Sequence, residues 1–360
     1  MIGEIPRTAK VAGGSLLAIG ALAAGAALGA TAARTVVRRS ARPDEDWSLE
    51  DFNAHELELE MSDGTTLHVE VDEPEDPTRA ELTIVFSHGY ALSLDSWYFQ
   101  RKELHGRARL VTYDQRSHGK SERADFDTHH VDQLGDDLGR VIDAVAPTGP
   151  LVLIGHSMGG MTIMALAEQR PELIAERVYG VVLVSSAAGG LQHMPLGLPG
   201  ILTPALSRAV PAIASLMSAR SGMVERARKH SGDLNLLLTR LYSFGTVASE
   251  QAGKFVSQMI DRTPIDVLAE FIPALQEHDK TDALSILQQT EVLVIAGTSD
   301  RLTPISYSRE IVQAIPGAEL VEIEDGGHMA LIEFHEQVDE QIAAFIDRVW
   351  RNIDAHRAQA

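Results

Sequence analysis

The sequence predicts an α/β protein built on a mostly parallel, doubly wound sheet. Between residues 82 and 350, short apolar runs rich in β-branched residues alternate with segments of helical periodicity. This alternation is typical of parallel strands joined by right-handed crossovers. One apolar run leads directly into a Gly-x-Ser-x-Gly turn. The 360 residues are 44% hydrophobic and 23% charged, which suits a large core with an added insertion.

The Gly-x-Ser-x-Gly turn occupies residues 155–159, between an apolar strand and a helical segment. A serine on so sharp a turn must accept strained backbone angles, and the flanking glycines let strand and helix pass closely. The turn should expose Oγ of Ser157 and place the N–H of Met158 at a helix N-terminus, which favours an anion. We therefore predict that Ser157 is a nucleophile and that Met158 supplies one backbone donor of an oxyanion hole.

Polar residues also follow the two strands that precede this turn. The strand 82–87 ends in His88-Gly89-Tyr90, and the strand 109–114 ends in Asp114. Parallel sheets bind ligands at the carboxyl ends of their strands, so these residues should gather near Ser157. We expect the N–H of Tyr90 to be the second oxyanion donor and the side chain of His88 to be structural.

Charge and cysteine content exclude several classes of function. The net charge is −20; residues 1–42 hold six Lys and Arg against one Glu, so the remainder carries about −25. Such an acidic chain is a poor partner for nucleic acid. No cysteine is present, which excludes disulfides, thiolate catalysis and thiolate metal sites.

Residues 11–33 form an uncharged stretch with basic residues on both sides. As a helix rising ~1.5 Å per residue, the stretch can span a hydrocarbon core of ~30 Å. Its length favours an uncleaved membrane anchor, and the heavier basic flank that follows favours a cytoplasmic catalytic domain. The alternative is a signal peptide cleaved after Ala30-Thr31-Ala32 and secretion of the mature protein.

The chain divides into an N-terminal segment, a core in two parts and an insertion. Polar residues without periodicity predict a linker after the basic flank, and about a hundred residues with helical, apolar character interrupt the series of strands. We predict that this insertion is a helical cap over the carboxyl ends of the strands. The predicted boundaries are 1–42 for the anchor, 43–54 for the linker, 55–189 and 286–352 for the core, and 190–285 for the cap.

Five motifs in order resemble the α/β-hydrolase superfamily, in the capped branch that includes esterases, lipases and cofactor-free haloperoxidase-like enzymes. The resemblance covers roughly residues 55–350. The motifs are His88-Gly89, Asp114-x-Arg116-x-His118-Gly119-x-Ser121, Gly155-His156-Ser157-Met158-Gly159-Gly160, Ser299-Asp300-Arg301-Leu302-Thr303-Pro304 and Gly327-His328-Met329. Ser117 stands where the family usually has glycine, which should alter a turn and leave the chemistry intact.

The resemblance implies a catalytic triad of Ser157 as nucleophile, Asp300 as acid and His328 as base, and implies no metal or organic cofactor. Glu324 and Asp325 are rival acids, but they lie within a few residues of His328. The acid should instead approach from a neighbouring strand end, which favours Asp300.

The adjacent pair His129-His130 suggests a metal site only weakly, because no third ligand stands at a suitable spacing.

The expected substrate is a carboxylic ester with a hydrophobic acyl or alcohol part, either a small-molecule ester or a lipid-like one, since the cap is apolar. Two alternatives use the same triad: perhydrolase or haloperoxidase-like activity, and hydrolysis of a C–C bond. A ligand-binding homologue without turnover is the alternative from another class.

The anchor gives a first prediction. The full-length protein should sediment with membranes after alkaline carbonate washing, and a chain lacking residues 1–42 should not, because only residues 11–33 are long and apolar enough to span a bilayer. Fractionation and immunoblotting would measure this. A mature protein in the medium that begins near Ala33 would establish the signal peptide instead.

Overall fold

The computed structural model describes most of the chain, namely Trp47, Phe52, Ala54 and residues 55–193, 239–245 and 248–359. Residues 11–33, where the sequence favours an anchor, lie outside these ranges, as does the part of the expected cap between residues 194 and 238. Among the helices of the described ranges, none combines the length and the apolar character that a bilayer span requires.

The strands form one eight-stranded sheet within the described residues, in the order β1-β2-β4-β3-β5-β6-β7-β8. The edge hairpin is antiparallel, β2 pairs antiparallel with β4, and the other pairs are parallel. The mostly parallel sheet is therefore confirmed. The strands are β1 His55–Glu60, β2 Thr66–Asp72, β3 Thr83–Ser87, β4 Arg109–Tyr113, β5 Leu151–His156, β6 Val178–Val184, β7 Glu291–Gly297 and β8 Glu319–Ile323.

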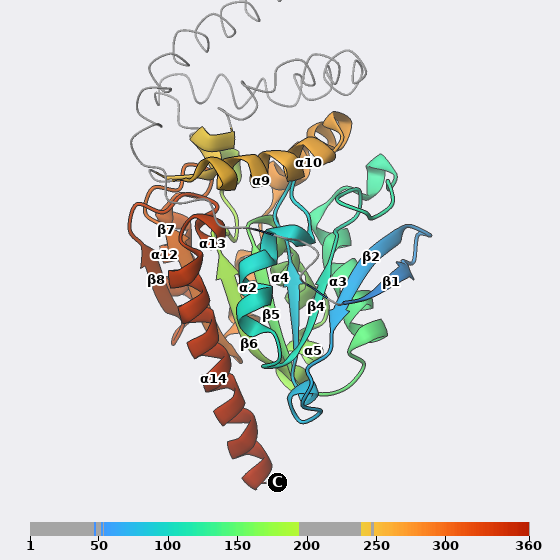
Figure 1. Ribbon diagram of the computed structural model, residues 1–360, viewed down its shortest axis with the longest axis vertical. Helices are drawn as coiled ribbons and strands as arrows, with labels where there is room; N and C mark the ends of the chain where they lie inside the picture. The colour runs from blue at the N-terminus through green and yellow to red at the C-terminus, as the bar shows by residue number, and fades with distance from the viewer. Residues whose placement is uncertain (1–46, 48–51, 53, 194–238, 246–247, 360) are drawn as a thin grey trace, which may run out of the picture.

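Helices cover both faces of the sheet, so each central strand is apolar on both sides (Figure 1). In β5, Val152 and Ile154 belong to one core cluster, whereas Leu151 and Leu153 belong to another. The first cluster is covered by α2 Tyr98–Leu104 and α14 His335–Gln359. The second is covered by α3 Val131–Val145, α4 Met158–Gln169, α5 Pro171–Arg177, α11 Leu284–Leu287 and α12 Ile305–Ala314.

Two helices of the expected cap, α9 Glu250–Arg262 and α10 Ile265–Glu277, lie beyond the carboxyl ends of the strands (Figure 1). The apolar pattern of residues 265–275 predicts a cap helix, which corresponds to α10. The sequence analysis did not separate α9, whose first turn is capped by the hydroxyl of Ser249. Both ends of α10 are tied to the core. The hydroxyl of Tyr90 donates to the carbonyl of Leu268, and a ring nitrogen of His278 bonds the carbonyl of Ala187 at 3.0 Å.

Two aromatic residues of the expected linker pack on the core. The ring of Trp47 meets Phe99 of α2 and Phe255 of α9 edge to face, with centroids 5.0 and 5.3 Å apart. Phe52 contacts Tyr98 in the same manner. Trp47 and Phe52 therefore attach the linker, whose composition is otherwise polar, to the core at two positions.

The closing helix is divided. The sequence predicts one helix from Met329 to Arg351, whereas the structure has a short α13, Ala330–Glu333, followed by α14. Phe334 separates them because its backbone angles, φ −126° and ψ 40°, are not helical. The break turns the chain between the loop after β8 and the long helix that covers the sheet.

A buried ion cluster joins the hairpin turn, the loop after β4 and α3. Nε and Nη2 of Arg116 each donate to the carboxylate of Asp137 at 2.7 Å, and Nη1 donates to Asp63 at 2.7 Å. The side chains of Arg116 and Asp137 are at most 1% exposed. Removing Asp137 would take two hydrogen bonds from the buried guanidinium of Arg116 and leave Asp63, which is a quarter exposed, as its remaining acidic partner in the cluster.

We therefore predict that Asp137→Ala lowers the free energy of unfolding by about 3–5 kcal/mol, measured by urea denaturation. The matched control is Asp136→Ala on the same helix, whose pair with Arg140 is about half exposed and which should cost only ~0–1 kcal/mol. Equal losses in the two variants would contradict the difference in burial.

Candidate active site

Ser157 occupies a strained turn between β5 and α4. Its φ of 52° and ψ of −115° are angles that side-chain-bearing residues rarely adopt. A Cβ on Gly159 would lie 1.9 Å from the carbonyl oxygen of Ser87, and one on Gly155 would lie 2.5 Å from the backbone of Gly159. The strained backbone expected at Ser157 is therefore confirmed, and so is the close approach that requires glycine at positions 155 and 159.

His328 and Asp300 come together from loops after β8 and β7. Nδ1 of His328 lies 2.9 Å from Oδ2 of Asp300, and both side chains are buried. The N–H groups of Leu302 and Thr303 donate to Oδ1 of Asp300 at 2.8 and 2.9 Å. Burial opposes ionisation of Asp300, but the charge and hydrogen bond of His328 and the bonds from Thr303 outweigh it, so the pKa of Asp300 is lowered.

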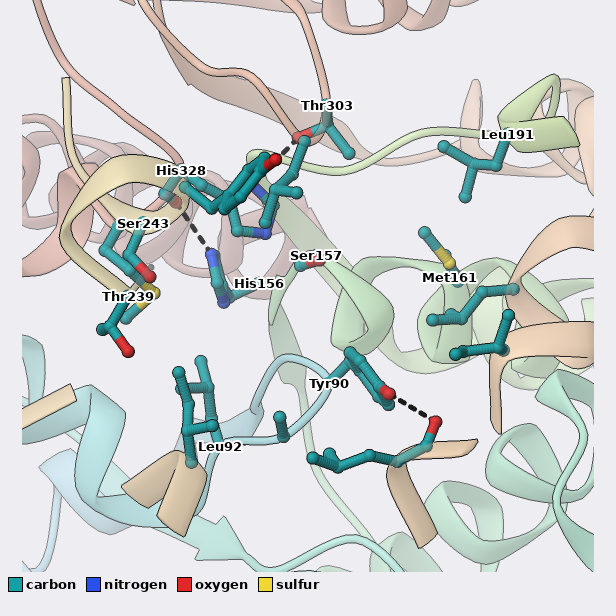
Figure 2. A pocket seen from close by; sticks show the side chains of 18 of the residues that line it. Tyr90, Leu92, His156, Ser157, Met161, Leu191, Thr239, Ser243, Thr303 and His328 are labelled. Carbon is teal, nitrogen blue, oxygen red and sulfur yellow. Dashed lines mark hydrogen bonds between the residues drawn. The ribbon is translucent and has the colours of Figure 1, made fainter. Parts of the chain in front are cut away.

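Ser157 and His328 line the same cavity, and Figure 2 shows both at its wall. Within the described residues, no hydrogen bond joins Oγ of Ser157 to the ring of His328; such bonds are often long before substrate binds. The rival acids Glu324 and Asp325 are exposed, and neither is bonded to His328. The geometry thus pairs the histidine with Asp300.

Thr303 is a site residue to which the sequence assigned no role. Its hydroxyl lies 2.8 Å from Oδ2 of Asp300, 3.1 Å from Nδ1 of His328 and 2.9 Å from the carbonyl oxygen of Ser185. One hydroxyl proton serves one acceptor at a time, so Thr303 can both donate to a carbonyl and accept from the imidazole. The signal in the sequence is a threonine three residues after an aspartate, which favours a side-chain-bonded turn.

The loop of Tyr90 approaches the N-terminus of α4. Within the described residues, no hydrogen bond occupies the N–H of Tyr90 or of Met158. Ala91, next to Tyr90, has a φ of 64°, and its N–H donates to Nε2 of His118 at 3.2 Å. The imidazole of His118 therefore helps to fix the turn that presents the Tyr90 amide.

Three buried histidines around the site are structural. Nε2 of His88 accepts from the N–H of Gln115 at 2.9 Å, and a ring nitrogen of His156 bonds the carbonyl of His328 at 3.0 Å. Burial lowers the pKa of His88 and His156 to about 3 and that of His118 to about 4. These rings therefore stay neutral at pH 7, in agreement with the structural role expected for His88.

Ser117 takes the left-handed conformation that glycine adopts most readily, with a φ of 65°. Its Oγ accepts from the N–H of Ala124 at 2.9 Å and lies 2.8 Å from Nε2 of His129. The side chain thus adds bonds to the loop while the turn keeps its shape.

The histidines of the His129-His130 pair have separate partners. His129 bonds Ser117, whereas Nδ1 of His130 accepts from the N–H of Gln133 at the start of α3. Another group with metal-ligand spacing, Glu56, His68 and Glu70, lies beside cationic side chains. Arg101 bonds Glu70 at 2.7 Å, and Nζ of Lys120 lies 3.4 Å from Glu56.

The cavity beside Ser157 has a volume of about 560 Å³, within the usual range for small-molecule sites. Apolar side chains from the core, from α9 and from α10 form most of its wall (Figure 2). They are Ala91, Leu92, Met161, Leu191, Ile260, Ile265, Leu268, Ile272, Leu275, Leu302 and Met329. A small organic molecule with a hydrophobic part fits this lining.

A family model described as alpha/beta hydrolase fold matches residues 83–334. A dihydrolipoyllysine-residue acetyltransferase component of an acetoin cleaving system from Pseudomonas putida is 26% identical over 265 residues; the match covers 73% of this chain and 63% of that protein. The chain thus spans less than two thirds of that relative. A 3-oxoadipate enol-lactonase from Acinetobacter baylyi is 27% identical over 300 residues, covering 82% of this chain and 98% of that protein.

Among solved structures, a thermophilic esterase from Thermogutta terrifontis superposes with a TM-score of 0.63 at 23% identity. The superposition covers 82% of this chain and 99% of that chain. A likeness at this identity shows the fold alone.

The neutral histidines predict a loss of stability in acid. Unfolded histidine takes up a proton below pH ~6.5, whereas His88, His118 and His156 resist protonation until pH about 3–4, so protons favour the unfolded chain in this window. Asp114 acts in the opposite direction, because burial raises its pKa to about 6. Among the described residues, five buried histidines with a lowered pKa outnumber the four groups whose raised pKa opposes them, namely His68, Asp114, Asp137 and Asp339. The free energy of unfolding, measured in urea, should therefore fall between pH 6.5 and pH 4.5.

His118→Gln removes one titrating ring and should flatten this dependence by up to about 1.4 kcal/mol per pH unit. A free energy of unfolding that stays constant or rises as the pH falls would refute the neutral assignment.

Proposed function

Because the chain belongs to the α/β-hydrolase fold family, we propose that it is a serine hydrolase that cleaves a carboxylic ester through an acyl-enzyme. The observation that carries the proposal is the 2.9 Å pair of His328 and Asp300, with His328 and Ser157 lining one apolar cavity. In this proposal, Ser157 is the nucleophile, His328 the base and Asp300 the acid.

The reaction follows from the site. The hydroxyl of Ser157 is a weak nucleophile at neutral pH, so His328 takes its proton as Oγ attacks the acyl carbon. Asp300 holds the imidazole in the required tautomer and stabilises the imidazolium. The N–H groups of Tyr90 and Met158 stabilise the oxyanion, at ~3 kcal/mol or more per donor. His328 then protonates the leaving alkoxide, and water repeats the sequence on the acyl-enzyme.

The lining of the cavity supports an ester with a hydrophobic acyl or alcohol part. Apolar side chains surround Ser157, and their burial against a substrate favours binding by ~0.8 kcal/mol per methylene group. The enol-lactonase relative acts on a lactone, which is a cyclic carboxylic ester, and so supports the same bond class.

For the N-terminal segment, the composition of residues 11–33 supports the further proposal that the enzyme is anchored to a membrane.

The test is labelling with a fluorophosphonate, which reacts with an activated serine. We expect one adduct, located at Ser157 by peptide mass spectrometry. Ser157→Ala should abolish it, His328→Ala should slow it greatly, and Asp300→Asn should reduce kcat by roughly 10⁴-fold, because the amide favours the wrong imidazole tautomer.

The matched control is Asp325→Asn, which changes an exposed carboxylate near His328 and should leave labelling intact. Equal labelling of wild type, Ser157→Ala and His328→Ala would end the hydrolase proposal. Values of kcat/KM on esters of increasing chain length, compared with turnover of peroxide and of a diketone, separate ester hydrolysis from the two alternative chemistries.

A further inference from the structure

The segment 239–245, which belongs to the expected cap, contacts both loops that carry the proposed acid and base. Its residues Thr239, Tyr242 and Ser243 line the cavity together with His328, and Figure 2 shows Thr239, Ser243 and His328 at the wall. Nη1 of Arg301, next to Asp300, donates to the carbonyl of Leu241 at 2.8 Å. On the other side, the N–H of Met329, next to His328, donates to the carbonyl of Ser243 at 2.7 Å.

The backbones of this segment and of the histidine loop touch directly. A Cβ on Gly327 would lie 2.3 Å from the nitrogen of Gly245 and 2.5 Å from Cα of Phe244. A Cβ on Gly245 would lie 1.8 Å from the carbonyl oxygen of Asp325. Only glycine allows so close an approach, and amide groups enclosed in this way need an acceptor supplied by the protein.

The acceptor is one carboxylate oxygen. Oε2 of Glu333, at the end of α13, accepts from the N–H of Gly327 at 2.8 Å and from the N–H of Gly245 at 3.0 Å. Glu333 is 6% exposed. A charged acceptor forms stronger hydrogen bonds than a neutral one, and here it bonds two chain segments at a single atom.

We propose that Glu333 is a positioning residue that fixes the loop of His328 to the cavity segment 239–245. Through this bond, the imidazole is held in register with the wall that contacts the substrate. The inference rests on the proposed function for the role of His328 as base, whereas the link between the two segments is a property of the fold. Positioning matters because a displacement of about 1 Å in a reacting group can cost about 10²-fold in rate.

The experiment compares Glu333→Ala, Glu333→Gln and wild type in the full chain. The matched control is Glu336→Ala, which changes an exposed glutamate three residues further on. Hydrogen–deuterium exchange, read by mass spectrometry, follows peptides covering 239–245 and 324–329. Values of kcat and KM are measured on p-nitrophenyl acetate, which is too short to fill the cavity, and on p-nitrophenyl octanoate.

For Glu333→Ala, we expect faster exchange in both peptides and a kcat lowered about 10–100-fold on both esters, with KM close to wild type. Glu333→Gln keeps an acceptor of the same reach and should restore most of the loss. If the alanine variant does not fold, Glu333→Gln decides the question: a neutral amide accepts weaker bonds than a carboxylate, so both peptides should exchange faster than in wild type, and unchanged exchange would contradict the inference. Glu336→Ala should behave as wild type.

Two results would overturn the inference. One is unchanged exchange in the 324–329 peptide; the other is a rise in KM for the octanoate alone, which would show that Glu333 supports only the cavity wall. If wild type hydrolyses neither ester, the proposed function fails, and the exchange pattern alone decides whether Glu333 links the two segments.

Discussion

The contact between the first turn of α4 and the end of β3 is the constraint on which the site depends. The Cα of Gly159 lies against the carbonyl of Ser87 so closely that no side chain fits between them. The positive φ of Ser157 costs about 1–3 kcal/mol and persists only because the surroundings enforce it. The N–H of Ser157 adds a bond to the carbonyl of Val184 on β6, 2.9 Å away. The packing of helices on both faces of the sheet thereby fixes the position of the Ser157 hydroxyl.

Local patterns made much of this fold predictable. Central strands are apolar throughout because both faces are covered, and the turn at Ser157 has a short signature that forces its own geometry. The partners of the serine are different. Asp300 and His328 lie 28 residues apart, on loops that follow the adjacent strands β7 and β8. No local pattern predicts that these two residues pair. The family resemblance implied the pairing.

Contacts between distant segments explain what the sequence missed. The spacing of Asp300 and Thr303 signals a local turn but not the contacts of the Thr303 hydroxyl with two further loops. Glu333 bonds an amide 88 residues away, a contact that leaves no spacing signal. The helix after β8 was predicted as continuous because its apolar residues keep helical spacing across Phe334. At this break, Phe334 leaves the helical angles, and Glu333, the residue before it, accepts from the N–H groups of Gly327 and Gly245.

The packing of Trp47 has a practical consequence for protein production. Its indole lies against Phe99 of the core and Phe255 of α9, so a truncated chain that starts at the first strand would expose the parts of both rings that the indole covers. Uncovered aromatic surface of this kind favours aggregation. A shortened version for crystallisation should therefore retain the tryptophan and place the cut in the basic stretch that precedes it.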